Sequence, residues 1–542
     1  MKKLPQINIS EISVDRLTSI IERAKIAPIA NEDFSILKLA ITTLSILTEE
    51  IRAKNASIFR LKKLLFGAST EKTREVLKEK KSDKVCGADE SSKTTNTKKR
   101  IGHGRNGVQA YQGAKKIQIT HKELKRGDCC PDCGKGKVYE QQQPVSLIRV
   151  AGMAPINAEI YECEQLRCNC CGTVFTAKAP EGVGAKKYDE SVSAMIGILK
   201  YSCGVPFNRL EKLQAGFGIP LPAGTQWDLI EKSVEQIEPA YKELMQQSAQ
   251  AEVLHNDDTT MKILGYDVEV LSENRKEERK RTGCFTTGII AKIKEGIRTA
   301  LFYTGHKHAG ENLAELLEKR EKELSSPIQM CDALSRNVMG ELKTILANCM
   351  AHARRRFVDV VESFPEECKV VLEALKEVYR NDEIAREEKM TSEERLRLHQ
   401  EKSAPVMKRL EEWLRKQFDE KKVEPNSTLG DAIRYMLKHW MELTLFLREP
   451  SAPLDNNICE RALKKAILNR KNSYFYKTEN GARVGDMYMS LIYTAELNGE
   501  NSFEYLVALQ RHSDEVRKNS AEWMPWNYRK TLANLKSGSD PP

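Results

Sequence analysis

The sequence predicts a multidomain α+β protein, and three observations support this fold class. A chain of 542 residues exceeds the size at which a single hydrophobic core usually suffices. Seven of its 14 cysteines fall between Cys129 and Cys171, which sets a small cysteine-rich segment apart from the rest. From about residue 251, short β-rich runs alternate with helical runs, as expected of a sheet covered by helices.

Composition indicates a soluble protein, and its charge favours a polyanionic partner. No stretch approaches the roughly 18 to 20 uncharged apolar residues that span a bilayer, and MKKLPQINIS is not followed by the apolar run of a signal peptide. We therefore expect a cytoplasmic protein. The formal net charge is +10, and the segment from Lys93 to Arg126 contains many Lys and Arg but only one acid, Glu123. Such clustering is typical of DNA binding, although a solvated linker has the same composition.

Residues 1–77 are predicted to form an N-terminal helical segment with a coiled-coil seam. Five apolar residues recur at every seventh position: Leu37, Leu44, Ile51, Ile58 and Leu65. Self-association through this seam is one interpretation, and a helix packed on its own domain is the other. Residues 78–118 are poor in apolar side chains and are predicted to be a flexible basic linker, with Lys98, Lys99 and Arg100 as candidate DNA contacts.

Residues 119–180 are predicted to form a zinc ribbon. Two C-x-x-C knuckles, each followed by glycine, provide four thiolates for tetrahedral Zn²⁺. The candidate ligands are Cys130, Cys133, Cys168 and Cys171, with Cys129, Cys163 and Cys170 as alternatives. The β-prone runs VSLIRV and INAEIYEC between the knuckles fit a hairpin. A closed site of four thiolates leaves no open position, so its role would be structural.

Residues 181–250 read as helix, Gly/Pro turn and helix. The pattern FNRLEKLQAGFGIPLPAGTQWDLIEKSVEQI places Thr225 to cap the second helix. A helix-turn-helix would insert that helix into the major groove of DNA. Two packed structural helices would have the same sequence pattern, and both interpretations stay open.

Residues 251–352 and 453–500 are predicted to form an α/β core interrupted by a helical insertion, 353–452. Three strands (AEVLHND, CFTTGIIAKI, TALFYTG) precede a helix (ENLAELLEKREKEL), a strand (PIQMCD), a helix (NVMGELKTIL) and a strand (ANCMAH). That order is typical of a ribonuclease H-like core. A helix beginning at NNICERALKKAIL would complete the core, and residues 501–542 would form a C-terminal tail.

Three acids occupy positions at which this core would bring them together. Asp257 ends the first strand, Asp332 ends the fourth, and Glu460 lies in the first turns of the last helix. Clustered carboxylates suit Mg²⁺ or Mn²⁺. Two such ions would support hydrolysis of a phosphodiester bond and then attack by the freed 3′-OH. Singly, each aspartate fits a turn or cap, Glu460 could pair with Lys464, and Asp258 is a rival for Asp257.

Basic and aromatic residues surround Glu460. The candidate phosphate contacts are Arg461, Lys464, Lys465, Arg470 and Lys471. Tyr474, Phe475 and Tyr476 could stack on bases near a cleaved end, and Asn472 could add a polar contact.

Through these residues, the chain resembles the large transposase of the insertion-sequence 66 family over nearly its whole length. The matching blocks are LKKLLFGASTEK, CPDCG to CNCCG, HNDDT, QMCDALSRN, CMAHARRRF, LDNNICERALKKAILNRKNSYFY, SLIYTAELNG and MPWNY. The DNN-x-x-ER…RKN run is the most specific of them. The resemblance implies a DDE-type transposase of a bacterial insertion sequence, acting at the nucleoid, with Asp257, Asp332 and Glu460 as metal ligands. It also implies recognition of element-end inverted repeats and small accessory proteins of the same element.

Two other functions fit part of the sequence. A zinc-ribbon DNA-binding regulator that has lost catalysis would keep the cysteines and helices, but the intact acids argue against it. A ribonuclease H-like nuclease would hydrolyse DNA without joining it.

Overall fold

The computed structural model describes residues 20, 21, 24, 34, 37, 125–129, 131, 137, 153–167, 174–178, 180, 186–266, 269–270, 280–281, 283–293, 296–338 and 343–537. The chain divides into two compact units: Met1–Lys80 with Met350–Leu454, and Lys81–Cys349 with Asp455–Pro542. We call them the first and the second unit. The predicted linker 78–118 and the predicted coiled-coil seam beyond Leu37 lie outside the described residues.

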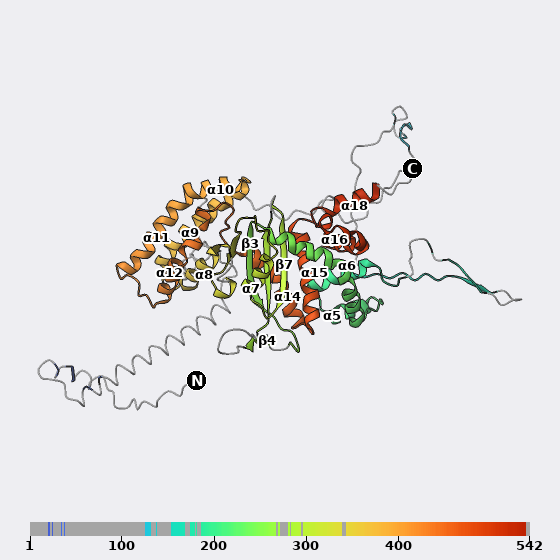
Figure 1. Ribbon diagram of the computed structural model, residues 1–542, viewed down its shortest axis with the longest axis horizontal. Coiled ribbons are helices and arrows are strands. Elements are labelled where there is room, and N and C mark those ends of the chain that lie inside the picture. Colours follow the sequence, from blue (N-terminus) through green and yellow to red (C-terminus); the bar gives the residue numbers. More distant parts are fainter. Residues whose placement is uncertain are drawn as a thin grey trace. The chain divides into compact units, whose positions relative to one another are not determined.

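A five-stranded mixed sheet organises the second unit (Figure 1). Its strands are β3 (Val253–Thr260), β6 (Phe285–Lys292), β7 (Arg298–Gly305), β8 (Ile328–Cys331) and β9 (Ile345–Asn348). They lie in the order β7-β6-β3-β8-β9. β3, β6 and β7 are antiparallel neighbours, whereas β3, β8 and β9 are parallel. β3 and β8, the first and fourth core strands along the chain, are therefore neighbours.

The structure corrects three of the predicted elements. Asp257 lies inside β3, because this strand continues to Thr260 in register with β6. The helix predicted over 337–346 is wrong at both of its described ends, since Ser335–Asn337 is one 3-10 turn and Ile345 begins β9. The strand predicted over 347–352 is also wrong in its second half, because α8 (Met350–Val360) begins there.

The outer edge of β7 is covered by α15 (Glu479–Leu497), whose side chains satisfy the strand's backbone. Asp486 accepts a hydrogen bond from Thr304 N, Ser490 from Phe302 N and Thr494 from Ala300 N. Four helical residues advance about 6 Å and two strand residues about 6.6 Å, so successive turns of the helix meet alternate strand residues. An edge occupied in this way cannot accept another strand.

Helices α4 (Glu190–Gly197), α5 (Phe207–Gly216) and α6 (Ala223–Ala249) and the π-helix η3 (Ile198–Ser202) precede the sheet. α6 buries residues along its whole length and contacts α4, α15 and α16. Its exposed side chains carry both signs of charge, with Asp228, Glu231 and Glu235 beside Lys232 and Lys242. The helix is therefore packed on its own unit along one side, and the helix-turn-helix stays a prediction.

Thr225 does not cap α6, so that prediction is wrong. The helix begins at Ala223 after Pro222, and Glu211 Oε2 accepts a hydrogen bond from the Ala223 N–H at 3.3 Å. Gln226 instead donates to the carbonyls of Leu221 and Phe207, which ties the turn to the start of α5.

The rest of the second unit consists of helices and short strand pairs. α7 is Ala309–Leu317 and α14 is Asn457–Ser473. α16 (Ser502–Arg511), α17 (Ser513–Lys518), η8 (Ser520–Trp523) and α18 (Tyr528–Ser537) follow α15. Tyr505, Trp523 and Tyr528 are buried, and α16 packs on α4 and α6, so the segment expected as a tail is folded onto the core.

Short antiparallel pairs flank both cysteine knuckles in the sequence. β1 (Gln165–Arg167) pairs with β2 (Val174–Thr176), and Cys129 forms an isolated bridge with Lys137. The four candidate zinc ligands, Cys130, Cys133, Cys168 and Cys171, lie outside the described residues. A further short pair joins β4 (Glu269–Val270) and β5 (Lys280–Arg281).

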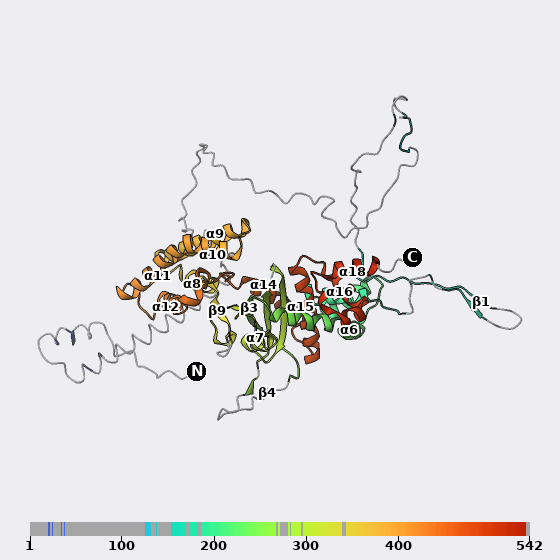
Figure 2. The ribbon, with the colours of Figure 1, turned by 45° about the horizontal axis from the view of Figure 1, so that its top comes forward.

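The described residues of the first unit are predominantly helical, as predicted for the insertion (Figure 2). After α8 come α9 (Pro365–Glu387), α10 (Ser392–Leu398), η6 (His399–Ser403), α11 (Ala404–Asp419), α12 (Thr428–Lys438), α13 (Trp440–Leu443) and η7 (Leu445–Leu447). Asp382 accepts from Arg395 Nε at 2.7 Å and lies 3.4 Å from His399, which links α9 to α10 and η6. Within the described part of the chain, no helix has both the length and the apolar character needed to cross a membrane.

Candidate active site

The three acids singled out in the sequence meet in the second unit. Asp257 lies on β3, Asp332 directly follows the parallel neighbour β8, and Glu460 lies in the first turn of α14. Asn337 Nδ2 is 2.5 Å from Asp332 Oδ1 and 3.5 Å from Asp257 Oδ1. Asp332 and Glu460 both act electrostatically on Asp257, so the three carboxylates share one locality.

This crowding changes the acidity of Asp257. Its pKa is raised to about 7, mainly by burial and also by the charges of Asp332, Asp258 and Glu460, while the hydrogen bond that it accepts from the Asp258 N–H lowers it. A cation among the carboxylates would offset this repulsion, and all-oxygen donors suit Mg²⁺ or Mn²⁺. The acids therefore fit a divalent cation. Glu460 also lies within 4.8 Å of the Cys349 thiol, a ligand type that softer metals prefer.

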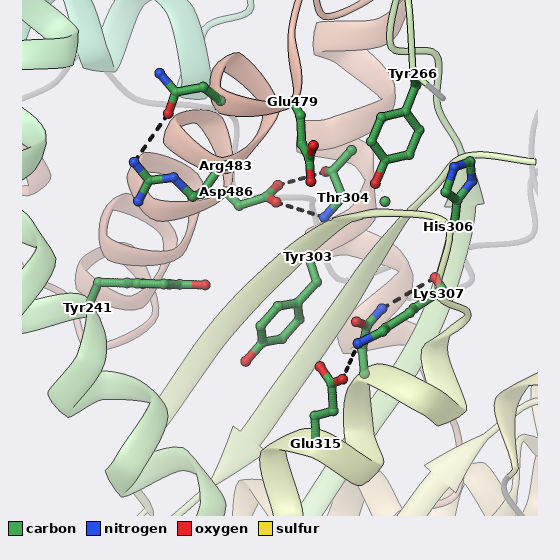
Figure 3. A pocket seen from close by; sticks show the side chains of 13 residues that line it. Tyr241, Tyr266, Tyr303, Thr304, His306, Lys307, Glu315, Glu479, Arg483 and Asp486 are labelled. Atoms are coloured by element: carbon green, nitrogen blue, oxygen red, sulfur yellow. Dashed lines mark hydrogen bonds and ion pairs between the residues drawn. The ribbon is translucent and has the colours of Figure 1, made fainter. Parts of the chain in front are cut away.

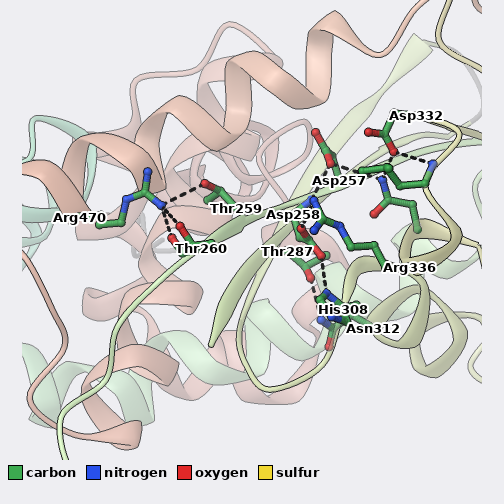
Figure 4. A network of polar contacts seen from close by, with 12 residues as sticks. Asp257, Asp258, Thr259, Thr260, Thr287, His308, Asn312, Asp332, Arg336 and Arg470 are labelled. Atoms are coloured by element: carbon green, nitrogen blue, oxygen red, sulfur yellow. Dashed lines mark hydrogen bonds and ion pairs between the residues drawn. The ribbon is translucent and has the colours of Figure 1, made fainter. Parts of the chain in front are cut away.

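Asp258 faces a different set of partners. Its side chain is almost fully buried and contacts His308 Nδ1 at 2.8 Å and Arg336 at 3.4 Å (Figure 4). Successive residues of a strand point to opposite faces of the sheet, so only Asp257 faces Asp332. The alternative of Asp258 in the acid cluster is disfavoured by this geometry.

A chain of buried amides connects the three acid-bearing segments. Asn456 donates to the Asn256 carbonyl at 3.1 Å and contacts His255 Nδ1 at 3.1 Å, which anchors the start of α14 to β3. Asn256 and Gln329 both donate to the Asn337 carbonyl, at 2.9 and 2.8 Å. Gln329 also donates to Asn256 Oδ1 at 3.1 Å. All four amides are fully buried: Asn256, Gln329, Asn337 and Asn456.

A glycine allows α14 to approach the sheet closely. Gly288 is the register partner of Asp257 on β6, and Cys459 Sγ donates to its carbonyl at 3.2 Å. A Cβ at Gly288 would lie 3.0 Å from Leu463 Cδ2, closer than ordinary contact allows. The small residue thus places Glu460, next to Cys459, beside Asp257.

The basic residues predicted on α14 divide into two groups. Arg461, Lys464 and Lys471 are exposed, and Lys464 and Lys471 follow Glu460 at spacings that put them on its face of the helix. Lys465 instead pairs with Glu496 at 3.1 Å, and Arg470 donates to Thr259 and Thr260 at the end of β3 (Figure 4). Lys98, Lys99 and Arg100 lie outside the described residues.

The aromatic residues after α14 also differ in their surroundings. Tyr474 is 69% exposed and Phe475 is 41% exposed, whereas Tyr476 is buried and accepts from Asn469 Nδ2. Tyr476 therefore cannot stack on a base. Asn472 donates to the Gly204 carbonyl at 2.9 Å, so its amide already has a structural partner. Tyr474 has φ +67°, a conformation that side-chain-bearing residues rarely adopt.

Sequence reasoning missed two features of the second unit. One is the amide chain, whose sequence signal is limited to Gln329 inside the otherwise apolar strand β8, because Asn256 lies in the polar run of β3. The other is a pocket of about 580 Å³ beside the end of β7, lined among others by Tyr241, Tyr303 and Asp486 (Figure 3). No motif marks its residues, because they come from α6, β7 and α15.

The sequence is similar to that of one protein family and of several individual proteins. Residues 186–484 match the model of the Transposase IS66 family, a span that contains all three acids. Three uncharacterized proteins of Sinorhizobium fredii (strain NBRC 101917 / NGR234) are similar to the chain. y4jD is 28% identical over 377 residues, covering 62% of this chain and 66% of that protein, slightly under two thirds of its length. y4hP is 26% identical over 387 residues, covering 68% of each.

The third relative, y4qI, is 31% identical over 207 residues, covering 36% of each chain. The family match spans more than half of the 542 residues and includes the sheet, α14 and the start of α15. The chain belongs to the Transposase IS66 family.

Proposed function

We propose that this protein is a DDE-type DNA transposase that cleaves DNA at the ends of a bacterial insertion sequence and joins those ends to target DNA. The observation that carries the proposal is the convergence of Asp257, Asp332 and Glu460 from two neighbouring strands and a packed helix. The strand order, with the first strand between the second and the fourth, supports a ribonuclease H-like catalytic core. Family membership supports transposition as the outcome.

The acids would hold two divalent cations, Mg²⁺ or Mn²⁺. When bound, such ions activate the attacking oxygen and stabilise the leaving oxygen of an in-line displacement at phosphorus. The protein's part is to fix the carboxylates through β3, β8 and α14, so that a scissile phosphate meets a preorganised site. Water would serve as the first nucleophile and the freed 3′-OH as the second.

The exposed face of α14 would bind the DNA backbone next to this site. Arg461, Lys464 and Lys471 are exposed, and a DNA backbone running alongside Glu460 would pass the face of the helix that carries Lys464 and Lys471. Tyr474 and Phe475 would stack on unpaired bases at a cleaved end. Lys465 and Arg470 have intramolecular partners, so we assign them to holding α14 in place.

The N-terminal third would supply recognition and assembly. We propose that residues 119–180 hold structural Zn²⁺ through Cys130, Cys133, Cys168 and Cys171, that Lys98, Lys99 and Arg100 bind DNA, and that the segment 1–77 mediates self-association. Double-stranded element ends and target DNA are the proposed partners, with small accessory proteins of the same element. Metal analysis of freshly purified, reduced protein tests the ribbon: an absence of zinc would remove it.

The decisive test compares the wild-type protein with Asp332→Ala on DNA that carries the element ends. Wild type with Mg²⁺ should nick the ends and form donor–target junctions that sequencing detects. The variant should bind the ends with similar affinity and do neither, with a loss of at least about 10³-fold in rate expected from removing a metal ligand.

Other outcomes identify the competing functions. Equal activity of both proteins would remove the role of Asp332. Cleavage without junctions would indicate a nuclease that stops after hydrolysis. Binding of the ends without cleavage by wild type would indicate a DNA-binding regulator.

A further inference from the structure

We propose that Asn337 is a positioning residue of the acid cluster, whose side-chain amide holds Asp257 and Asp332 side by side for joint binding of a divalent cation. The inference rests on the proposed function for the identity of the cation-binding acids. It adds a residue whose side chain contacts both aspartates and carries no charge.

The contacts of Asn337 are directed at both aspartates. Nδ2 donates to Asp332 Oδ1 at 2.5 Å and lies 3.5 Å from Asp257 Oδ1. An amide NH₂ has two hydrogens, so one nitrogen can serve two acceptors. The side chain thus joins carboxylates that come from β3 and from the end of β8.

The backbone of Asn337 is fixed by the buried amides described above. Its carbonyl accepts from Asn256, which precedes Asp257, and from Gln329 on β8. Because these bonds use the main chain of residue 337, they persist when its side chain is replaced. The turn Ser335–Asn337 would therefore keep its place in a variant, and the side chain's own contribution can be measured.

The carbonyl oxygen of the Asn337 side chain, Oδ1, indicates what determines the orientation of this amide. Asn337 is fully buried, and its Oδ1 has no hydrogen-bond partner among the described residues. A buried asparagine with a purely structural role normally satisfies both ends of its amide. Here the carboxylates determine the orientation, at the cost of an unsatisfied oxygen, which points to a functional constraint.

A neutral donor suits this position chemically. Lysine or arginine between the carboxylates would occupy the place of the cation, whereas an amide orients them and leaves their net charge available. Groups that orient metal ligands in this way typically change metal affinity by about 10- to 100-fold when they are removed.

The test measures Mn²⁺ binding to the full-length protein, by calorimetry and by the electron paramagnetic resonance of free Mn²⁺, without DNA. We expect Asn337→Ala to bind Mn²⁺ about tenfold or more weakly than wild type, with unchanged secondary structure. In DNA cleavage, the Mn²⁺ concentration for half-maximal rate should rise to the same extent. Asn381→Ala is the matched control, because Asn381 is a buried amide of the first unit that donates to Ser403.

A second variant at position 337 keeps the inference testable if the alanine variant does not fold. If Asn337→Ala does not fold, Asn337→Ser keeps a small hydroxyl that is too short to reach both carboxylates, and it should also weaken Mn²⁺ binding. A folded Asn337 variant with Mn²⁺ affinity within twofold of wild type would overturn the inference. A mere structural role would lower thermal stability without moving the Mn²⁺ dependence.

Asp332→Ala separates this inference from the proposed function. If wild type binds Mn²⁺, Asp332→Ala does not, and Asn337→Ala binds as wild type, then only the role of Asn337 fails. If Asp332→Ala binds Mn²⁺ as tightly as wild type, the assignment of the acids itself fails.

Discussion

Asp486 is a carboxylate buried where α15 closes the edge of the sheet. It accepts hydrogen bonds from the backbone N–H and the hydroxyl of Thr304, both at 2.7 Å. Burial raises its pKa to about 7, although these hydrogen bonds lower it. Its charge therefore depends on pH within the range in which the protein would work.

The pH dependence of this residue has a definite sign. Below about pH 4 the carboxyl is protonated in the folded and the unfolded chain. As the pH rises toward 7, the unfolded chain ionises while the folded chain keeps its proton, so the free energy of unfolding falls. Asp486→Asn should remove roughly 2 to 4 kcal/mol of that fall. Urea unfolding at pH 5 and pH 8 measures it.

Asparagine at position 486 can still accept from the Thr304 N–H, so the contact with β7 should persist. Asp228→Asn, an exposed change on α6, is the control and should leave the pH dependence unaltered. A variant at 486 with the wild-type pH dependence would show that this carboxyl does not titrate in the folded protein between those pH values.

At the level of single residues, the sequence predicted the three acids but not the buried amides that hold their segments together. Asp257, Asp332 and Glu460 follow from strand ends and a helix start that local patterns reveal. The amides that join them do not, because Asn256, Asn337 and Asn456 pair across 80 to 200 residues. Tyr476 and Lys465 looked available for DNA, but burial and an ion pair with Glu496 depend on contacts that no local pattern encodes.

Among the elements, α14 carries most of the proposed site. Its first turn holds Glu460, Asn456 anchors its start to β3, and Cys459 rests on Gly288. Its last turn is tied to the end of β3 through Arg470. The position of this one helix therefore sets the distance between Glu460 and Asp257.

Gly288→Ala tests that dependence. The new Cβ would lie 3.0 Å from Leu463 Cδ2 and 3.2 Å from its Cγ, so Leu463 must shift by a few tenths of an ångström, and we expect α14 to shift with it. We expect a loss of about 1 to 3 kcal/mol in the free energy of unfolding and weaker Mn²⁺ binding, since Glu460 moves with the helix. Chemical denaturation and Mn²⁺ titration report the two effects.

Gly224→Ala is the matched control. Gly224 lies in the first turn of α6, and an added Cβ there meets nothing within 4 Å. This change should leave Mn²⁺ binding unaltered and raise stability slightly, because alanine favours helix. Unchanged metal binding in Gly288→Ala would mean that the approach of α14 does not govern the site.

Element types were predictable where the pattern was long, and less so where it was short. The first four core strands were found at their predicted places, and α14 starts at Asn457 as expected. ANCMAH was misread because a short apolar run fits both a strand and a buried helix. The structure divides it between β9 and α8, with the change at Met350.

At the scale of the whole molecule, charge should govern DNA affinity. Each phosphate contact adds about 0.9 to the slope of log affinity against log salt concentration. Replacing Lys98, Lys99 and Arg100 together by glutamine should therefore lower that slope by roughly 2 to 3. Fluorescence anisotropy with duplex DNA at several salt concentrations measures it.

The control makes the same change in net charge elsewhere. Lys402, Lys408 and Arg409 are exposed on the first unit, and replacing them by glutamine also removes three positive charges. An equal decrease in slope for both triple variants would mean that overall charge, rather than the predicted basic linker, determines DNA binding.

The second unit is assembled from two stretches of chain, separated by Met350–Leu454. During translation, Asp257 and Asp332 are added to the chain first. The helical segment Met350–Leu454 must then be synthesised before Glu460 is added. A nascent or prematurely terminated polypeptide therefore has an incomplete set of acids and no α14 to close over them. Under the proposed mechanism, the chain would be unable to cut the DNA that encodes it until translation has passed residues 350–454.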